Sequence, residues 1–235
     1  MVERNTNMDM EQNLEDVTGF NLRSLRTIRD LFIRPREVFE TYQEGTLGRY
    51  APSFKIWISL VGLTFLVLFL LGGADSFYAQ YSGDSFRGLL EAADIPEDKF
   101  DDFMNVWAEI LSIAQMPIVS VFMLLTVPLL KRFNRELSVA ARVNIAFAIL
   151  IPSLVIGFGT LILAKFYHLS MLASMSVTWL TYFVTFFRGT LGWFNNTFPQ
   201  AFFKSLLYTL ALIVIEFVAY LVVIFVTSMI TLQQF

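Results

Sequence analysis

Five long runs of apolar residues dominate the chain, and shorter polar stretches separate them. The runs cover about residues 54–73, 108–130, 139–164, 169–187 and 205–230. A helix that crosses the hydrocarbon of a bilayer needs about 20 mostly apolar residues, and each run is close to that length. The pattern therefore predicts an all-α, polytopic membrane protein with five transmembrane helices. The alternative is four crossings, with the third and fourth runs forming a hairpin that does not cross fully.

The positions of the basic residues predict which ends of these helices face the cytoplasm. Of the seventeen Lys and Arg residues, all but Arg87, Lys99 and Lys165 lie before or at the start of the first run, between the second and third runs or near the start of the third, or between the fourth and fifth. Short cytoplasmic loops of membrane proteins collect Lys and Arg. The distribution favours five crossings, with the N-terminus in the cytoplasm and the C-terminus outside.

The polar stretches suggest how the chain is divided. Residues 1–20 are polar, acidic and rich in Asn, and we expect a disordered tail. Residues 21–52, which we call the entrance segment, are predicted to form cytoplasmic amphipathic helices. Residues 53–235 form the predicted transmembrane domain, with an acidic outer loop over residues 74–107.

Part of the outer loop has helical spacing. Pro96 stands where a helix would begin, acidic residues follow it, and Phe100, Phe103 and Trp107 recur on one face. This predicts a short amphipathic helix on the outer surface. The acidic residues are interpreted either as a solvated cap or as a Ca²⁺ site, and the cap is favoured because the D-x-D-x-D-G loop pattern is absent.

The entrance segment begins with an amphipathic pattern. Its apolar face is predicted to hold Leu22, Leu25, Ile28, Leu31 and Phe32, and Arg23, Arg26 and Arg29 lie off that face. A helix of this kind can lie among lipid headgroups, held by anionic lipid, or bind a partner. It can equally pack under the helix bundle. Pro35 ends this helix and starts a second, and Gly45 breaks the chain again.

The stretch "RPREVFETYQEGTLGRYAPSFKIW" (residues 34–57) resembles the region before the first span in an uncharacterised bacterial membrane family of the Ypt-interacting-protein (Yip) superfamily. The resemblance is carried by Pro35, Arg36, Tyr42, Gly45, Arg49, Tyr50 and Pro52. It implies a five-helix fold with a cytoplasmic N-terminus and, from eukaryotic relatives, roles in membrane traffic and organisation. We therefore expect a protein of the bacterial cytoplasmic (inner) membrane. Members often carry an N-terminal cysteine zinc ribbon, which this chain lacks. The resemblance implies no catalytic residues.

Glu216 stands alone in the last apolar run, and a charge near the middle of a bilayer is costly. Polar residues that could contact the Glu216 carboxylate are Gln115 in the second run, Thr178 and Thr181 in the fourth, and Tyr220 one turn further along the fifth. We expect Gln115 and Thr178 or Thr181 to donate hydrogen bonds to Glu216. One interpretation is that these groups hold the helices together, and the alternative is a ligand or proton site.

Composition narrows the function. The chain is 56% hydrophobic and 16% charged, with no cysteine and a single histidine, His168. Disulfides, thiol nucleophiles, cysteine zinc sites and multi-histidine metal clusters are therefore excluded. The P-loop, G-x-S-x-G, H-E-x-x-H and Rossmann patterns are absent, so an enzyme is not favoured. We expect a membrane-organising or accessory protein that binds lipid, another membrane protein or a second copy, without cofactor, metal or nucleic acid. The alternative is a small transporter for a lipid, proton or apolar solute.

Overall fold

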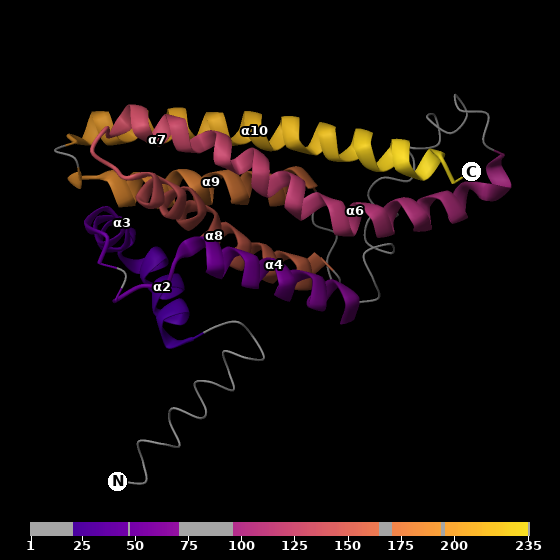
Figure 1. Ribbon diagram of the computed structural model, residues 1–235, viewed down its shortest axis with the longest axis horizontal. Coiled ribbons are helices and arrows are strands. Elements are labelled where there is room, and N and C mark those ends of the chain that lie inside the picture. Colours follow the sequence, from indigo (N-terminus) through magenta and orange to yellow (C-terminus); the bar gives the residue numbers. More distant parts are fainter. Residues whose placement is uncertain (1–20, 47, 71–95, 165–170, 194–195, 235) are drawn as a thin grey trace, which may run out of the picture. The chain divides into compact units, whose positions relative to one another are not determined.

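Every regular element in the described part of the chain is a helix. The computed structural model describes residues 21–46, 48–70, 96–164, 171–193 and 196–234. The elements, shown in Figure 1, are α2 (Leu22–Ile33), α3 (Pro35–Glu44), α4 (Ser53–Leu70), η1 (Glu97–Lys99), α6 (Phe100–Met123), η2 (Leu124–Thr126), α7 (Val127–Phe133), α8 (Val139–Ala164), α9 (Met171–Thr190) and α10 (Phe198–Leu232). The all-helical prediction is confirmed for these residues. The predicted tail, most of the acidic loop and His168 lie outside them.

Three stretches of the described chain are long and apolar enough to cross a membrane. They are Phe100–Phe133, Val139–Thr160 and Phe198–Leu232. The stretch Ser53–Val67 is apolar but shorter. Large apolar side chains also lie on the surface of α10, where Val214, Phe217 and Phe225 are 61%, 63% and 66% exposed. Apolar surface of this extent is typical of a protein whose surroundings are hydrocarbon, so the chain has the character of a membrane protein.

Short polar and conformational signals set the helix ends. The Asn21 side chain accepts a hydrogen bond from the backbone N–H of Ser24 at 2.8 Å and so caps α2. Pro35 occupies the first position of α3, where its missing N–H costs nothing. Gly45 ends α3 with a φ of 72°, a left-handed conformation that glycine adopts without strain.

The last helix starts earlier than the hydropathy pattern predicts. The backbone N–H of Thr197 donates to Oε1 of Gln200 at 3.0 Å. A Gln at this spacing after a Thr forms half of a capping box, a common way to begin a helix. This contact explains why α10 begins at Phe198, ahead of the apolar run that begins near residue 205.

The helices fall into two compact units. The first contains residues 21–62 and 123–213 of the described chain, and the second contains residues 63–122 and 214–234. In the first unit α8 is the central helix and packs against α2, α3, α7 and α9 (Figure 1). Its residues 145–151 are all buried, so these seven successive side chains pack against neighbouring helices. In the second unit Phe103, Trp107, Leu111 and Val223 belong to one buried cluster from α6 and α10.

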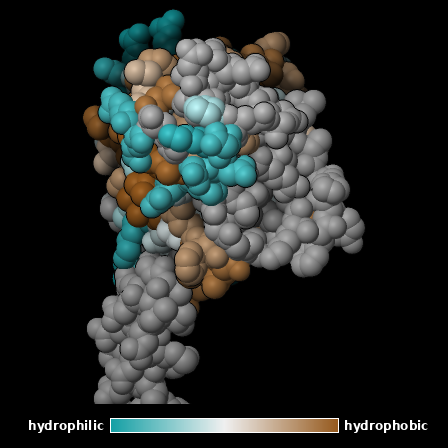
Figure 2. Space-filling view, turned by 90° about the vertical axis from the view of Figure 1, so that its right-hand side faces the viewer, coloured by the Kyte–Doolittle hydropathy of each residue, from teal (hydrophilic) through white to brown (hydrophobic). Residues whose placement is uncertain are grey.

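Two predicted local features differ in the structure. The predicted surface helix around Phe100 is continuous with the second apolar run, because α6 extends from Phe100 to Met123. Phe103 and Trp107 are only 2% exposed, so the aromatic face that suggested a surface helix packs inside the second unit. The first turn of this helix is polar: Figure 2 looks onto the end where α6 begins, and hydrophilic residues gather on the described surface there. Asp98, Asp101 and Asp102 are exposed at this end.

The second difference concerns the face that α2 buries. Its buried residues are Ser24, Thr27, Asp30 and Leu31. Leu22 and Leu25, two residues of the predicted apolar face, are 60% and 53% exposed. Of the predicted apolar face, only Leu31 is buried, and the helix packs through polar side chains instead.

Candidate functional site

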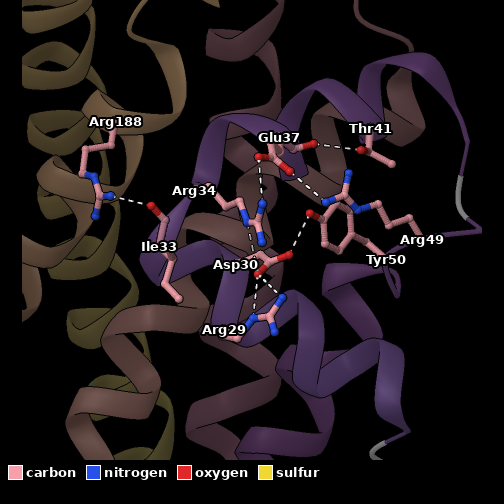
Figure 3. Close-up of polar contacts among 9 residues, drawn as sticks. All are labelled: Arg29, Asp30, Ile33, Arg34, Glu37, Thr41, Arg49, Tyr50 and Arg188. Atoms are coloured by element: carbon pink, nitrogen blue, oxygen red, sulfur yellow. Dashed lines mark hydrogen bonds and ion pairs between the residues drawn. The ribbon is translucent and has the colours of Figure 1, made fainter.

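Polar side chains of the entrance segment form a hydrogen-bonded cluster, which we call the entrance cluster. It brings together side chains of α2, α3 and the loop that leads into α4 (Figure 3). Every one of the seven residues that carry the family resemblance lies in it. The contacts described next explain how these side chains are held and what they leave exposed.

A buried carboxylate lies at the centre of the cluster. The side chain of Asp30 is fully buried, and its Oδ2 accepts a hydrogen bond from the Tyr50 hydroxyl at 2.9 Å (Figure 3). Its Oδ1 accepts a hydrogen bond from Nε of Arg29 at 2.8 Å, and Nε of Arg34 lies at 3.6 Å. A buried charge is tolerated only when it is paired and hydrogen-bonded, and Asp30 meets both conditions.

The titration of Asp30 and Tyr50 reflects this pairing. Burial alone raises the pKa of Asp30, but hydrogen bonds from Arg29 and Tyr50, together with the charges of Arg29 and Arg34, lower the pKa overall. Burial, and then the hydrogen bond and charge of the Asp30 carboxylate, raise the pKa of Tyr50 to about 12. The folded protein therefore favours an ionised aspartate beside a protonated tyrosine.

Glu37 connects the two arginines that flank this pair. Its carboxylate lies 3.2 Å from Nη1 of Arg34 and 2.8 Å from Nη2 of Arg49. The Arg49 guanidinium also lies over the Tyr50 ring, 5.1 Å from its centre. These three charged side chains are 39% to 50% exposed, so each ion pair contributes only about 0–1 kcal/mol.

A second set of contacts fixes the loop before α4. The Tyr42 hydroxyl donates to the carbonyl of Ala51 at 2.7 Å and lies 2.7 Å from the Ser53 hydroxyl. The N–H of Ala51 donates to the hydroxyl oxygen of Thr27 at 3.0 Å. The N–H of Ser53 donates to Oδ1 of Asn144 on α8 at 2.9 Å. The loop is thereby tied to α2, α3 and α8 at once, and burial raises the pKa of Tyr42.

Polar contacts also tie α2 and α3 to the end of α9. The Arg188 guanidinium donates to the carbonyl of Phe32 at 2.7 Å and to that of Ile33 at 2.6 Å, and Figure 3 shows the contact with Ile33. These carbonyls belong to the last turn of α2, where no intrahelical donor is available. Nε1 of Trp193 donates to Oε1 of Gln43 on α3 at 2.8 Å.

An aromatic cluster completes the attachment. The Phe39 ring of α3 lies 6.5 Å from that of Phe186 and 5.6 Å from that of Trp193. Phe186 in turn stacks on Tyr208 of α10 at 4.4 Å and lies 6.1 Å from Phe133 of α7. Side chains of α3, α7, α9 and α10 therefore meet at one place in the first unit.

The remaining residues of the resemblance have local structural roles. Arg36 pairs with Glu40 one turn away at 2.6 Å. Arg36 also packs against Gly192: a Cβ added to Gly192 would lie 2.8 Å from Nη1 of Arg36. The φ of Gly192 is 71°, a left-handed conformation that favours glycine. Pro52 immediately precedes α4, and its carbonyl accepts from the N–H of Ile56 at 3.3 Å. The motif thus acts as a set of contacts that shapes two helices and a loop.

The residues predicted around Glu216 are placed in different units. In the second unit Nε2 of Gln115 donates to the Tyr220 hydroxyl at 3.2 Å, and Glu216 lies one helical turn before Tyr220 and is half-buried. Thr178 and Thr181 belong to the first unit. The Thr181 hydroxyl donates to the carbonyl of Val177 in its own helix at 2.7 Å. The predicted donation from Gln115 and from Thr178 or Thr181 to Glu216 stays a prediction.

Sequence reasoning missed several residues of the entrance cluster. Thr27, Asp30 and Arg188 were not among the predicted site residues, although each makes contacts that hold the cluster together. A signal was present, because Ser24, Thr27 and Asp30 recur at a spacing of three and form a polar stripe on α2. In the described chain, no group of three or more His, Asp or Glu side chains is arranged to hold a metal ion.

Comparison with protein-family models, with curated proteins and with solved structures gives no match to this chain.

Proposed function

We propose that the chain is a non-enzymatic integral protein of the bacterial inner membrane that organises the membrane or binds lipid or another membrane protein. The observation that carries the proposal is the attachment of α2 and α3 to α8 and α9. Arg188 holds the end of α2, and Trp193 holds α3. The polar groups are used to fix a surface in place, and a fixed surface favours binding because little conformational entropy is lost when a partner arrives.

The proposal includes five crossings and a cytoplasmic N-terminus. Phe39 of the entrance segment and Phe133 at the end of α7, both in segments predicted to be cytoplasmic, lie against Phe186 near the end of the fourth apolar run, and so does Tyr208 near the start of the fifth. Alternating helices that cross five times bring these ends to the same side. The lengths of α4 and α9, 18 and 20 residues, are also within the range of a spanning helix. Membership in the Yip superfamily is part of this proposal and is supported by the entrance motif alone.

One observation favours the alternative, a permeation site for a proton or small solute. Gln115 and Tyr220 are joined by a hydrogen bond one helical turn from Glu216. Ionisable residues inside a membrane often mark transport pathways. Glu216 is the residue that this alternative requires.

Native mass spectrometry of the full chain released from bacterial membranes tests the proposal. We expect phospholipid or a second membrane protein to remain bound in a fixed ratio. Arg188→Gln, which frees the last carbonyls of α2, should lower the retained fraction several-fold. Arg132→Gln is the matched control, because Arg132 is exposed at the end of α7, and it should leave retention unchanged.

A flux assay separates the two functions. Proteoliposomes that enclose a pH-sensitive dye should show the same proton leak with the parent chain and with Glu216→Gln. A purified chain that retains neither lipid nor protein, together with a flux that Glu216→Gln abolishes, would replace the proposed function with the transport alternative.

A further inference from the structure

We propose that the outward face of α2 is a membrane-surface anchor that binds the headgroups of anionic phospholipid. The outward face consists of the exposed side chains of this helix, Leu22, Arg23, Leu25, Arg26, Arg29 and Ile33. This inference rests on the proposed function, because it places the entrance segment at the cytoplasmic surface of a bilayer. It specifies that function by naming the surface, the chemical class of ligand and the side chains that contact it.

The first observation behind the anchor is that α2 buries polar side chains and exposes apolar ones. Ser24, Thr27 and Asp30 are completely buried, whereas Leu22, Leu25 and Ile33 are 60%, 53% and 58% exposed. Exposing apolar side chains to water is unfavourable, at roughly 25 cal/mol per Å² of apolar surface. The contacts of Asp30 and Thr27 with Tyr50 and Ala51 hold the helix in this orientation. An apolar environment on the outer side would remove the cost.

Charge is the second observation, and it selects the kind of apolar environment. α2 contains three arginines and one acidic residue, Asp30, which is already paired with Arg29 and Arg34. Arg23 and Arg26 are exposed, and no acidic side chain of the described chain forms an ion pair with either. Arginines beside leucines on one helical face are typical of helices that lie at the interface of an anionic membrane.

The acidic residues of the packed neighbours do not cancel this positive charge. On α3, Glu37 pairs with Arg34 and Arg49, and Glu40 pairs with Arg36. Each acid of α3 near the cluster is therefore matched by a basic residue. The exposed arginines of α2 remain as net positive charge, which complements phosphate and the anionic headgroups of phospholipids.

The third observation is the position of α2, which contacts the long apolar helices directly. α2 packs against α8, one of the helices long enough to cross a membrane. The last turn of α2 accepts two hydrogen bonds from Arg188 near the end of α9. The helix therefore lies at the ends of apolar helices, where the headgroups of a surrounding bilayer are found. Arginine side chains there can extend their charged ends towards phosphate while leucines enter the apolar boundary.

Spin labels on the full chain test this inference. The chain contains no cysteine, so Leu25→Cys provides a single labelling position on the outward face. Glu44→Cys, at an exposed position at the end of α3, is the matched control. The labelled chain is reconstituted in vesicles of phosphatidylcholine, with or without phosphatidylglycerol. Collisions with oxygen, which concentrates in the apolar phase, are compared with collisions with a water-soluble nickel chelate.

In vesicles with phosphatidylglycerol, we expect the label at position 25 to collide several-fold less often with the nickel chelate than in phosphatidylcholine alone. The label at position 44 should stay accessible in both. Arg23→Gln with Arg26→Gln should restore the collisions at position 25 while leaving the thermal unfolding temperature unchanged, since both arginines are exposed.

Two results would overturn the anchor. One is equal accessibility of position 25 to the chelate in both lipids. The other is shielding in both lipids together with spin–spin broadening that disappears on dilution with unlabelled chain, which would show that a second copy covers the face. Either result, combined with stoichiometric retention of lipid or protein in the mass-spectrometry test, would leave the proposed function intact. Immersion of position 25 without any retained lipid or protein would support the anchor and remove the wider function.

Discussion

Replacing Phe39 with alanine is expected to lower the free energy of unfolding by about 3–5 kcal/mol, the range for removing a fully buried aromatic side chain. Phe39 is completely buried. Its ring lies between Phe186 and Trp193 and covers Gly189 of α9. No other side chain in the cluster occupies the same volume, so a cavity would remain. Thermal unfolding of the full chain in detergent measures the loss, and an unchanged midpoint would show that α3 does not pack on α9.

Gly189 provides a second variant for the same contact. A Cβ added to Gly189 would overlap the Phe39 ring, so Gly189→Ala should cost about 1–3 kcal/mol through overpacking. In a chain that already carries Phe39→Leu, the same substitution should cost much less, because the smaller side chain leaves space. Neighbouring substitutions that share a contact are not additive. Equal effects of Gly189→Ala in the two backgrounds would contradict the packing described here.

Replacing Asp30 with alanine is expected to cost about 3 kcal/mol. The substitution removes charge-assisted hydrogen bonds from Arg29 and Tyr50 and leaves the buried Tyr50 hydroxyl without its acceptor. Arg29 and Arg34 are 57% and 45% exposed, so water can solvate their charges after the change. The loss is therefore smaller than the full penalty of leaving a buried charge alone. Thermal unfolding at neutral pH, with the parent chain alongside, gives the difference.

The pH dependence of stability tests the Asp30–Tyr50 pair. Tyr50→Phe is the control variant. The pKa of Tyr50 is raised from 10.0 to about 12 in the folded state, so the unfolded chain releases this proton first. Stability from this group is present below pH 10 and is lost as the pH rises towards 12. The pKa of Asp30 is lowered, so its contribution is lost as the pH falls below the ordinary value of 3.8. Tyr50→Phe should flatten the alkaline decrease, and superimposable alkaline curves would contradict the pairing.

Helix positions were predictable because their signals are local. The third apolar run, residues 139–164, coincides with α8 (Val139–Ala164). Pro35 and Gly45 mark both ends of α3 as expected. α10 was predicted too short because hydropathy alone does not register the Thr197–Gln200 cap, although the residue types were visible. These features depend on a few neighbouring residues, and a single sequence contains them.

The apolar pattern of α2 does not indicate which face is buried, and only the polar stripe of Ser24, Thr27 and Asp30 points to it. Hydrophobic periodicity assumes that apolar side chains turn inward, away from water. Thr27 and Asp30 turn inward here because their partners, Ala51 and Tyr50, follow 24 and 20 residues later, across α3. Near a membrane the outer side of a helix need not be aqueous, so the assumption behind the pattern fails. The role of Arg188 was invisible for the same reason, because its acceptors lie on a distant segment.

The orientation of α2 is the central claim, and a pair of engineered cysteines tests it most directly. The N–H of Ala51 lies 3.0 Å from the Thr27 hydroxyl, so Thr27→Cys with Ala51→Cys places two thiols near each other in an otherwise cysteine-free chain. Leu25→Cys with Ala51→Cys is the control, because Leu25 is on the opposite face. Oxidation in native membranes, followed by counting free thiols by mass spectrometry, should show a disulfide in the first pair and free thiols in the second. A disulfide between positions 25 and 51, with free thiols at 27 and 51, would show that the leucines face inward and would contradict the account.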